Sequence, residues 1–436
     1  MMRDPGLSLL EKHVLVLGMG DTGLSVARWV ERHGGRVRAA DTRPAPPRRE
    51  GFPGEVHTGA FHAGLLQGID LVCVSPGLAL SEPVIQKAKE QGIPVVGDVE
   101  LFAWHNRSPV LAVTGTNGKT TVTALTGHLL RSAGVDCEVA GNIAPPVLDA
   151  ALKRARPPAA WVLELSSYQL EATSSLAPRA AAMLNLTDDH LDRYADLRDY
   201  GAAKARIFRG ARLQVLNRDD ARSMAMARPG GEVVTFGLDA PPRAQDFGVA
   251  AGALVRGSSE IFPVDELGIR GLHNVANALA ACALVSSFNI SLDGLRTFKG
   301  LPHRLQLVAT RRGVEWYDDS KGTNVGATVA ALRGLGKKAV LILGGEGKGQ
   351  DFSPLKDAVA QHASKVLLIG RDAPLIAKVV GGERCGSLEE AVKHAAEVAR
   401  AGEAVLLSPA CASFDMFRDY KHRGEVFAAA VKALAP

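Results

Sequence analysis

The sequence predicts an α/β protein of three domains. Its 436 residues suggest about three domains at roughly 150 residues each. Short apolar runs of β type alternate with helical stretches, which is typical of parallel sheets covered by helices. Hydrophobic residues make up 46% and charged residues 22% of the chain, which are ordinary values for a globular protein.

The first predicted domain covers residues 1–106 and has a Rossmann-like, doubly wound fold. The apolar run His13–Leu17 leads into the turn Gly18-Met19-Gly20-Asp21-Thr22-Gly23. A helix should follow, because Leu24, Ala27, Trp29 and Val30 fit one helix face. Further strands are predicted at Val37–Ala40, which ends in Asp41, and at Leu71–Ser75, which continues into Pro76 and Gly77.

The second predicted domain covers residues 107–300 and starts where Ser108-Pro109 breaks the pattern. A strand at Val110–Val113 runs into the loop Gly115-Thr116-Asn117-Gly118-Lys119-Thr120, and a helix should span Lys119–Arg131. This order is that of a phosphate-loop ATPase with a mostly parallel sheet. The remaining predicted elements are strands at Trp161–Leu165, Ala181–Leu186 and Leu213–Leu216 and a helix at Asn274–Ser287.

The third predicted domain covers residues 301–436 and is again Rossmann-like. The boundary is placed at Lys299-Gly300-Leu301-Pro302. Short apolar strands are expected at Ala339–Leu343, Val366–Ile369 and Ala404–Leu407, with helices between them.

Charge and cysteine usage argue against several classes of protein. The formal net charge is only +5, and the basic residues are dispersed, so no nucleic-acid footprint is evident. Five separated cysteines form no zinc motif or disulfide framework. The sequence shows neither a signal pattern nor an apolar run of about 18 residues. We therefore expect a cytoplasmic protein without a membrane span.

The loop at Gly115–Thr120 has the chemistry of a phosphate site. Backbone N–H groups at a helix start can hold phosphates, Lys119 can reach the terminal phosphates, and the Thr120 hydroxyl can ligate Mg²⁺. The match is incomplete, because Val113 stands where the strict pattern has glycine. A chance glycine turn is the alternative.

Carboxylates at predicted strand ends are candidate metal ligands. Glu164 ends an apolar strand, and Mg²⁺ prefers hard oxygen ligands. Asp188, Asp189, His190 and Asp192 follow another strand and could form a site or only a capping turn.

The first glycine turn leaves two nucleotides open. Gly18, Gly20 and Gly23 followed by Asp41 fit a dinucleotide fingerprint, which by itself favours NAD. The rest of the chain shows an ATP site and no evident hydride-transfer machinery. The same turn could bind the pyrophosphate of a nucleotide-linked substrate, with Asp41, Thr42 and Arg43 near its ribose or base.

Three loops of the last domain are candidate ligand sites. Asp318–Asn324 and Gly344–Gly349 mix lysines with small residues, which suits anion binding, although the second could be a plain flexible turn. Ser408–Phe414 could let the backbone approach a ligand. Cys411 has no evident partnering base and is not expected to be a nucleophile.

Taken together, these segments resemble the Mur ligase family over essentially the whole chain. The most specific motifs are residues 115–121 (GTNGKTT), 164–170 (ELSSYQL), 189–194 (DHLDRY), 319–324 (DSKGTN) and 408–415 (SPACASFD). The likeness is closest to the branch that adds D-glutamate to UDP-N-acetylmuramoyl-L-alanine. It implies an ATP-dependent ligase acting through an acyl phosphate in cytoplasmic peptidoglycan synthesis, hence in cell wall biogenesis, cell shape and cell division. We expect a monomer.

The resemblance also implies site residues. ATP would contact Gly115, Thr116, Asn117, Gly118, Lys119, Thr120, Thr121, Asn274, Asn277, Arg304, Asp319 and Lys321. Two Mg²⁺ sites would use Thr120, Glu164, His190 and Lys204, the last if it is carbamylated by CO₂. Lys119, His190 and Lys204 would be catalytic.

The resemblance assigns two further substrate sites. The UDP substrate would contact Gly18, Met19, Gly20, Asp21, Thr22, Asp41, Thr42, Arg43, Ser75, Pro76, Gly77, Asn142, Ser166, Gln169 and His190. D-Glutamate would contact Lys321, Thr323, Lys348, Ser413, Phe414 and Tyr420. The loop at Glu346–Gln350 departs from the family pattern, because it is richer in glycine than in many relatives.

Three other functions stay open from the sequence. A related ligase could add another amino acid or make folylpolyglutamate. A nicotinamide-binding oxidoreductase or redox sensor would fit the first glycine turn. A non-catalytic scaffold gated by nucleotide is the third alternative.

Overall fold

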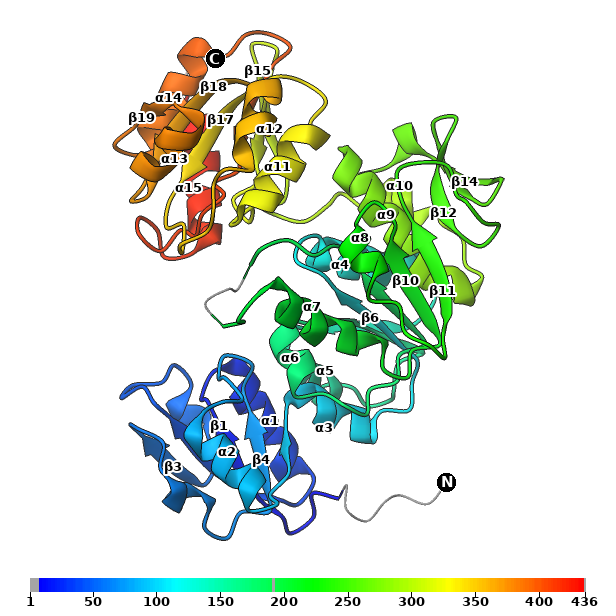
Figure 1. The fold of residues 1–436 in the computed structure, drawn as a ribbon, viewed down its shortest axis with the longest axis vertical. Helices are drawn as coiled ribbons and strands as arrows, with labels where there is room; N and C mark the ends of the chain where they lie inside the picture. Colours follow the sequence, from blue (N-terminus) through cyan, green and yellow to red (C-terminus); the bar gives the residue numbers. More distant parts are fainter. Residues whose placement is uncertain (1–7, 190–192, 435–436) are drawn as a thin grey trace.

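The computed structural model describes residues 8–189 and 193–434 and contains three α/β domains. They follow one another along the long axis of the molecule, from the N-terminal domain in blue to the C-terminal domain in orange and red (Figure 1). The predicted three-domain α/β architecture is therefore confirmed.

The first sheet is parallel, with strand order β3-β2-β1-β4-β5. Its strands are β1 (His13–Leu17), β2 (Arg36–Asp41), β3 (Glu55–Thr58), β4 (Leu71–Val74) and β5 (Val95–Val96). The helices of this region are α1 (Asp21–Arg32), α2 (Pro83–Glu90) and α3 (Asp98–His105). Chain order reverses between β1 and β4, so the crevice beyond their carboxyl ends is where a doubly wound sheet binds ligands.

The second sheet has the order β14-β13-β12-β11-β10-β9-β6-β8-β7. Its strands are β6 (Val110–Thr114), β7 (Cys137–Gly141), β8 (Ala160–Glu164), β9 (Ala180–Met183), β10 (Leu213–Asn217), β11 (Glu232–Phe236), β12 (Phe247–Ala250), β13 (Ala253–Arg256) and β14 (Ser259–Pro263). Pairing is parallel from β7 to β12 and antiparallel from β12 to β14. The sequence analysis did not predict this antiparallel extension.

The helices of the central domain are α4 (Lys119–Ser132), α5 (Val147–Leu152), α6 (Ser167–Glu171), α7 (Leu197–Ala205), α8 (Ala221–Met224), α9 (Leu272–Val285) and α10 (Gly294–Thr297). Several predicted boundaries were wrong. The strand predicted to reach Leu186 ends at Met183, because the chain then leaves the sheet to contact the phosphate loop. The helix predicted from Asn274 begins at Leu272, directly after Gly271 at φ +95°.

The third sheet has the order β15-β16-β20-β17-β18-β19 and is parallel except for the β15–β16 hairpin. Its strands are β15 (Gln306–Arg311), β16 (Val314–Asp318), β17 (Ala339–Gly344), β18 (Ala363–Ile369), β19 (Glu383–Arg384) and β20 (Ala404–Leu407). Its helices are α11 (Val325–Gly334), α12 (Leu355–His362), α13 (Ala373–Val380), α14 (Leu388–Val398) and α15 (Tyr420–Ala433).

The domains differ in how their cores are joined. One hydrophobic cluster continues from the first domain, where it includes Val14 and Val16, into the central domain, where it includes Trp161 and Leu163. The C-terminal domain packs around two clusters of its own, which lie on the two faces of its sheet and include Leu341 and Ile342. Burial of apolar side chains therefore ties the first two domains together more than it ties the third to them.

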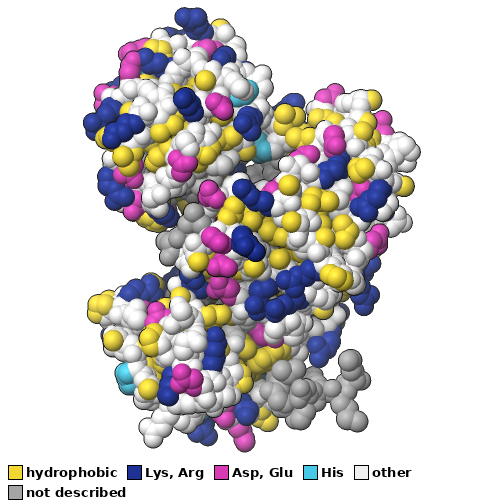
Figure 2. Space-filling model, viewed as in Figure 1, with side chains coloured by type: hydrophobic (Ala, Val, Ile, Leu, Met, Phe, Trp, Pro, Cys, Tyr) yellow, Lys and Arg dark blue, Asp and Glu magenta, His cyan; other side chains and the backbone are white. Residues whose placement is uncertain are grey.

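The surface carries charges of both signs on all three domains. On the face shown in Figure 2, Lys and Arg are interspersed with Asp and Glu and do not form one continuous stripe. Within residues 8–189 and 193–434, no helix is long and apolar enough to cross a membrane.

Candidate functional site

The phosphate loop joins β6 to α4. Gly115 has φ +152° and Gly118, the residue before α4, has φ +84° in the left-handed region. A Cβ on Gly118 would lie 2.7 Å from Asn277 Oδ1, so glycine is required there for both backbone and space. Val113, which stands in place of the first glycine of the strict motif, is fully buried in β6.

The segment that follows β9 fixes the shape of this loop. Asn185 Oδ1 accepts a hydrogen bond from Asn117 N at 2.8 Å, and Asn185 Nδ2 donates to Asn117 O at 3.1 Å. Thr116 Oγ1 donates to Thr187 O at 3.2 Å. The sequence analysis missed Asn185 and Thr187. The feature of the sequence that could have indicated them is their position directly before the acidic residues that begin at Asp188.

Two lysines converge on the loop. Lys119 Nζ donates to Gly115 O at 3.0 Å and to Thr116 O at 2.8 Å. Lys204, on α7 and only 1% exposed, donates to Gly115 O at 2.9 Å. Burial lowers the pKa of Lys204 well below its ordinary value, and the nearby Lys119 cation lowers it further. The structure thus places two predicted catalytic residues beside one carbonyl.

Glu164 lies at the end of β8, next to the phosphate-loop strand. Its carboxylate is 2% exposed, and Oε1 accepts a hydrogen bond from Asn142 Nδ2 at 2.7 Å. Oε2 is buried and has no hydrogen-bond partner among the described residues. A buried carboxylate oxygen without a partner is costly unless something pairs with it.

A second observation concerns Thr120, the other predicted metal ligand on this side. Its hydroxyl accepts a hydrogen bond from Arg304 of the C-terminal domain at 2.7 Å. Desolvation lowers the pKa of Arg304. Among the described residues no three His, Cys, Asp or Glu side chains gather as a metal cluster, and predicted ligand His190 lies outside the described residues.

Some of the predicted nucleotide residues line a cavity of about 710 Å³ between the central and C-terminal domains, whereas Asn277, Asp319 and Lys321 do not. Thr121, Asn274 and Arg304 line it. Asn277 Nδ2 donates to Asn274 Oδ1 at 3.1 Å, so the two predicted asparagines are neighbours on α9. Unpredicted lining residues include Arg270, Tyr317 and Lys337, which no short motif marks.

Asp319 and Lys321 are both desolvated at the start of the loop after β16. Burial raises the pKa of Asp319 to about 7, against the hydrogen bond that Ser408 Oγ donates to it at 2.7 Å. Burial lowers the pKa of Lys321 to about 8. The Lys321 ammonium lies 4.0 Å from the centre of the Tyr420 ring.

The loops predicted to hold an amino acid are brought together by buried hydrogen bonds. Arg423, fully buried on α15, donates to Ser320 O at 2.8 Å and to Cys411 O at 3.1 Å. Gln350 donates to Ala410 O at 2.7 Å. These contacts place the loop of Lys321 and Thr323, the loop of Lys348 and the loop of Ser413 and Phe414 at one edge of the sheet.

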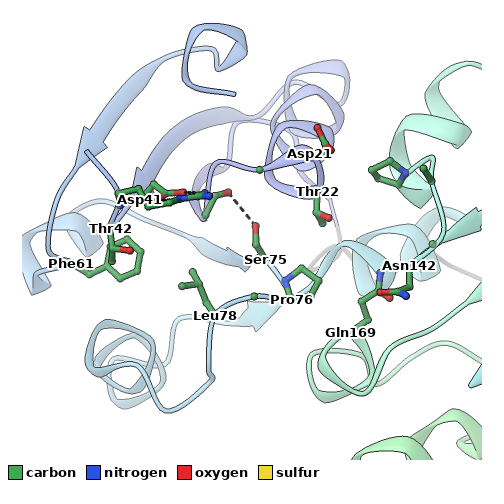
Figure 3. A pocket seen from close by; sticks show the side chains of 17 residues that line it. Asp21, Thr22, Asp41, Thr42, Phe61, Ser75, Pro76, Leu78, Asn142 and Gln169 are labelled. Carbon is green, nitrogen blue, oxygen red and sulfur yellow. Dashed lines mark hydrogen bonds and ion pairs between the residues drawn. The ribbon is translucent and has the colours of Figure 1, made fainter. Parts of the chain in front are cut away.

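The first domain contributes a cavity of about 600 Å³. Predicted residues on its wall are Gly18, Gly20, Asp21, Thr22, Asp41, Thr42, Arg43, Ser75, Pro76, Gly77, Asn142 and Gln169. Figure 3 shows Asn142 and Gln169, from the central domain, facing Ser75 and Thr22 of the first domain. The cavity therefore lies between the two domains that share a core.

Among the predicted residues that the structure describes, Met19 and Ser166 are not on the wall of this cavity, and His190 lies outside the described residues. Met19 is fully buried behind it, and its N–H donates to Asp41 Oδ2 at 2.7 Å. Ser166 caps α6, where its Oγ accepts from Gln169 N at 3.2 Å. Conversely, Phe61, Leu78, Ala144 and Pro146 line the cavity without having been predicted, because an isolated apolar residue in a loop carries no motif.

The hydrogen bonds of Asp41 argue against the NAD alternative. Arg43 Nε and Nη2 donate to the two oxygens of Asp41 at 2.8 and 2.6 Å, and Met19 N shares one of them. This pairing lowers the pKa of Asp41 to about 2. Arg43 N also donates to Asp41 Oδ1 at 2.9 Å, and a carboxylate already held by four donors is poorly placed to bind the ribose hydroxyls of a dinucleotide, as the fingerprint requires.

Comparison with known proteins covers all three domains. Residues 12–97 match the Mur ligase MurD-like N-terminal domain, residues 113–285 the Mur ligase middle domain, and residues 303–411 the Mur ligase, glutamate ligase domain.

Named relatives match over nearly their full length. The UDP-N-acetylmuramoylalanine--D-glutamate ligase of Thiobacillus denitrificans is 53% identical, covering 100% of this chain and 99% of its own. The enzyme of the same name from Methylobacillus flagellatus is 54% identical, with 98% of each chain covered.

Solved structures share the fold. MurF ligase from Thermotoga maritima in complex with ADP aligns with a TM-score of 0.61 at 15% identity, covering 100% of both chains. UDP-N-acetylmuramate-alanine ligase MurC from Thermotoga maritima aligns with a TM-score of 0.60 at 20% identity, covering 97% of this chain and 99% of its own. With three family domains in order and relatives more than half identical, this chain belongs to the Mur ligase family.

Proposed function

We propose that the chain is an ATP-dependent ligase that adds D-glutamate to UDP-N-acetylmuramoyl-L-alanine. The observation that carries the proposal is the end-to-end identity of 53% and 54% to two ligases named for that reaction. The site supports it, because Asn142 lines the first-domain cavity and also donates to Glu164 beside the phosphate loop. A nucleotide-linked substrate in that cavity would extend its far end towards the phosphates of ATP.

The reaction would proceed in two steps. The terminal carboxylate of the first substrate attacks the γ-phosphorus of ATP, so that a P–O bond to ADP breaks and an acyl phosphate forms. The amine of D-glutamate then attacks the acyl carbon, loses a proton, and expels phosphate from the tetrahedral intermediate. Both steps bring anions together, which calls for cations aimed at the transferring group.

Three cations near the phosphate loop, Lys119, Arg304 and Lys321, support this proposal. Lys119 is positioned on the loop by the carbonyls of Gly115 and Thr116. Arg304 reaches Thr120 from the C-terminal domain, and Lys321 lies on the adjoining loop. In this proposal Lys119 and Arg304 neutralise the γ-phosphoryl group, and Lys321 contacts both ATP and the carboxylate of the incoming amino acid.

The donor set near the loop fits Mg²⁺. Glu164 offers a buried oxygen without a hydrogen-bond partner among the described residues, and Thr120 offers a hydroxyl. Thr120 and Glu164 would hold one ion, and His190 with a carbamylated Lys204 would serve a second. Bound Mg²⁺ would supply positive charge to the phosphates during transfer.

Carbamylation of Lys204 has a chemical basis in its surroundings. CO₂ reacts with a neutral amine, and burial beside Lys119 lowers the pKa of Lys204 and so favours the neutral form. The product is an anion, which would sit next to Lys119 in place of a second cation. This change would convert a repulsive lysine pair into an attractive one.

The remaining assignments follow the domain arrangement. We place the UDP-substrate domain at residues 1–106, the ATP domain at 107–300 and the amino-acid domain at 301–436. D-Glutamate would contact Lys321, Thr323, Lys348, Ser413, Phe414 and Tyr420. The enzyme would act as a cytoplasmic monomer in peptidoglycan precursor synthesis, and so contribute to cell shape and cell division.

The direct test is ADP release by the purified chain with ATP, Mg²⁺ and UDP-N-acetylmuramoyl-L-alanine. D-Glutamate should support turnover, whereas L-glutamate and L-lysine should not. Turnover only with another amino acid would reassign the branch of the family, and turnover only with a folate substrate would point to folylpolyglutamate synthesis. Tight NADH binding without UDP binding would instead favour the oxidoreductase alternative.

A further inference from the structure

Three asparagines connect the central sheet to the C-terminal domain through the phosphate loop. Asn185, after β9, holds the backbone of Asn117 at both its N–H and its carbonyl. The side chain of Asn117 then reaches Asn324 of the C-terminal domain. Asn117 Nδ2 donates to Asn324 Oδ1 at 3.3 Å, and Asn324 Nδ2 donates to Asn117 Oδ1 at 3.1 Å.

The orientation of this amide pair is determined by a helix. Asn324 precedes α11, and its Oδ1 also accepts a hydrogen bond from Ala327 N at 2.8 Å. Capping requires the carboxamide oxygen to face the helix, so the NH₂ group of Asn324 is left to face Asn117 Oδ1. Each amide thus uses a donor and an acceptor in the contact, which an aspartate carboxylate cannot do because it only accepts hydrogen bonds.

The first turn of α11 also lies close to the phosphate loop, and a glycine there makes this possible. A Cβ on Gly326 would lie 3.1 Å from Thr187 Oγ1 and 3.4 Å from Asn117 Nδ2. Thr187 belongs to the segment that positions the phosphate loop. The absence of a side chain at residue 326 therefore allows the C-terminal domain to approach the loop closely.

These contacts matter because the C-terminal domain has its own hydrophobic cores. Its seating against the phosphate loop depends on polar contacts such as the Asn117–Asn324 pair and Arg304 with Thr120. Asn324 also ends the loop that carries Lys321 and Thr323. A shift of Asn324 would move both of these residues relative to Lys119.

We infer that Asn324 is a positioning residue that couples the conformation of the phosphate loop to the seating of the C-terminal domain. When Asn185 holds Asn117 in its nucleotide-binding shape, the Asn117 amide is presented to Asn324. Seating of Asn324 then brings Lys321 and Thr323 to the transferring group. The assignment of the loop and its lysine rests on the proposed function, whereas the coupling between domains does not.

The decisive variant is Asn324→Ser in the full-length chain. Serine keeps the helix cap but is too short to reach Asn117 and lacks its NH₂ donor. Ser387→Ala is the matched control, because Ser387 caps α14 in the same domain through Glu390 N at 3.1 Å. It removes a cap without touching the interface.

Two readouts separate positioning from folding. In a Cys385→Ser background, fluorophores at Ser258→Cys and Lys378→Cys report the distance between the central and C-terminal domains with a non-hydrolysable ATP analogue. We expect Asn324→Ser to bind the analogue within about threefold of the parent, to broaden the distance distribution, and to lose about tenfold or more in kcat. Ser387→Ala should change neither distance nor kcat.

Pair specificity is tested by Asn117→Ala, alone and with Asn324→Ser. If the two side chains act as one contact, the double variant should lose little more than the more damaging single variant. Fully independent losses, or a distance distribution unchanged in Asn324→Ser, would overturn the inference.

Failure of the parent chain to turn over D-glutamate would refute the proposed substrate while leaving the distance measurement to judge the coupling. If Asn324→Ser fails to fold, Gly326→Ala decides, because alanine favours the helix but adds a methyl group against Thr187. Unchanged domain distances in that variant would also reject the coupling.

Discussion

Asn142 Nδ2 donates a hydrogen bond to Glu164 Oε1 at 2.7 Å, and Asn142 also lines the cavity between the first two domains. One side chain therefore connects this cavity to the carboxylate beside the phosphate loop. Backbone pairing reinforces the link, since Asn142 N donates to Glu164 O at 2.8 Å.

Asn142→Ala should weaken both functions that meet at this residue. Glu164 would lose the only side-chain donor that the described residues offer it, a change that typically costs about 1–3 kcal/mol for a buried group. We expect a higher KM for the UDP substrate and weaker Mg²⁺ activation, measured by ADP release at varied concentrations of each. Asn106→Ala, at a remote turn held by Ser108 O at 2.7 Å, is the control. An effect on the UDP substrate alone would argue against the Glu164 link.

Lys119→Ala should abolish product formation. The amine is held on the phosphate loop by its hydrogen bonds to Gly115 O and Thr116 O, and loss of such a cation commonly costs about 10³-fold or more in phosphoryl transfer. The check is single-turnover ADP formation, with thermal unfolding to confirm that the variant folds. Retention of more than a tenth of parent activity would exclude this role for Lys119.

Lys204→Ala should lose about 10²-fold or more in activity and regain part of it when a small carboxylic acid is added. The acid would supply the anion that Lys204, if carbamylated as proposed, would provide beside Lys119. Activity is measured with and without acetate or propionate, and Lys119→Ala is the control that these acids should not rescue. Full activity in the unrescued Lys204→Ala variant would contradict the carbamate.

Phe61→Ala should raise the KM for the UDP substrate by about threefold to tenfold and leave kcat nearly unchanged. Phe61 lines the first-domain cavity beside Thr42 and across from Asn142 and Gln169 (Figure 3), and an aromatic contact with a base would add uniform binding energy. Phe61→Tyr keeps the ring and should behave like the parent. A fall in kcat at saturating substrate would show that Phe61 does more than bind.

Asp319 should make stability depend on pH. Burial raises its pKa from 3.8 to about 7, so the folded state holds this proton more tightly than the unfolded state. The stabilisation is fully present below about pH 3.8 and is lost as pH rises through 7. Asp319→Asn, which stays neutral, should therefore melt at a higher temperature than the parent at pH 8. The difference between the two melting temperatures should be smaller at pH 5.

The control for this comparison is Asp357→Asn, a change at an exposed helical position. It should not alter the difference between pH 5 and pH 8. The prediction would be contradicted if the melting temperature of Asp319→Asn exceeded that of the parent by more at pH 5 than at pH 8.

Local sequence was enough for features that depend on neighbouring residues. The phosphate loop and the first glycine turn were predicted because strand, glycines and helix are contiguous, and β1 was placed at its observed bounds, His13–Leu17. Gly23 shows the physical reason. A Cβ there would lie 1.9 Å from Gly18 O. Only glycine at this position lets α1 pack closely against the end of β1, so the spacing of the glycines in the sequence predicts this packing.

Tertiary structure decided what depends on residues far apart in the chain. Phe61 reaches the first cavity, Asn185 holds Asn117 from 68 residues away, and Asn324 meets Asn117 across 207 residues. The antiparallel strands β13 and β14 were also not predicted.

The sequence by itself determined the three-domain α/β class, from its length and from apolar runs that alternate with helical stretches, and the phosphate loop and the family, from short motifs whose residues are close in the chain. Only the tertiary structure decided that Asn142 bridges the first cavity and Glu164, that Met19 and Ser166 support the cavity without lining it, and that Asn324 faces the phosphate loop. Hydrogen-bond partners, unlike motifs, depend on how separate elements pack, and packing is set by the whole folded chain.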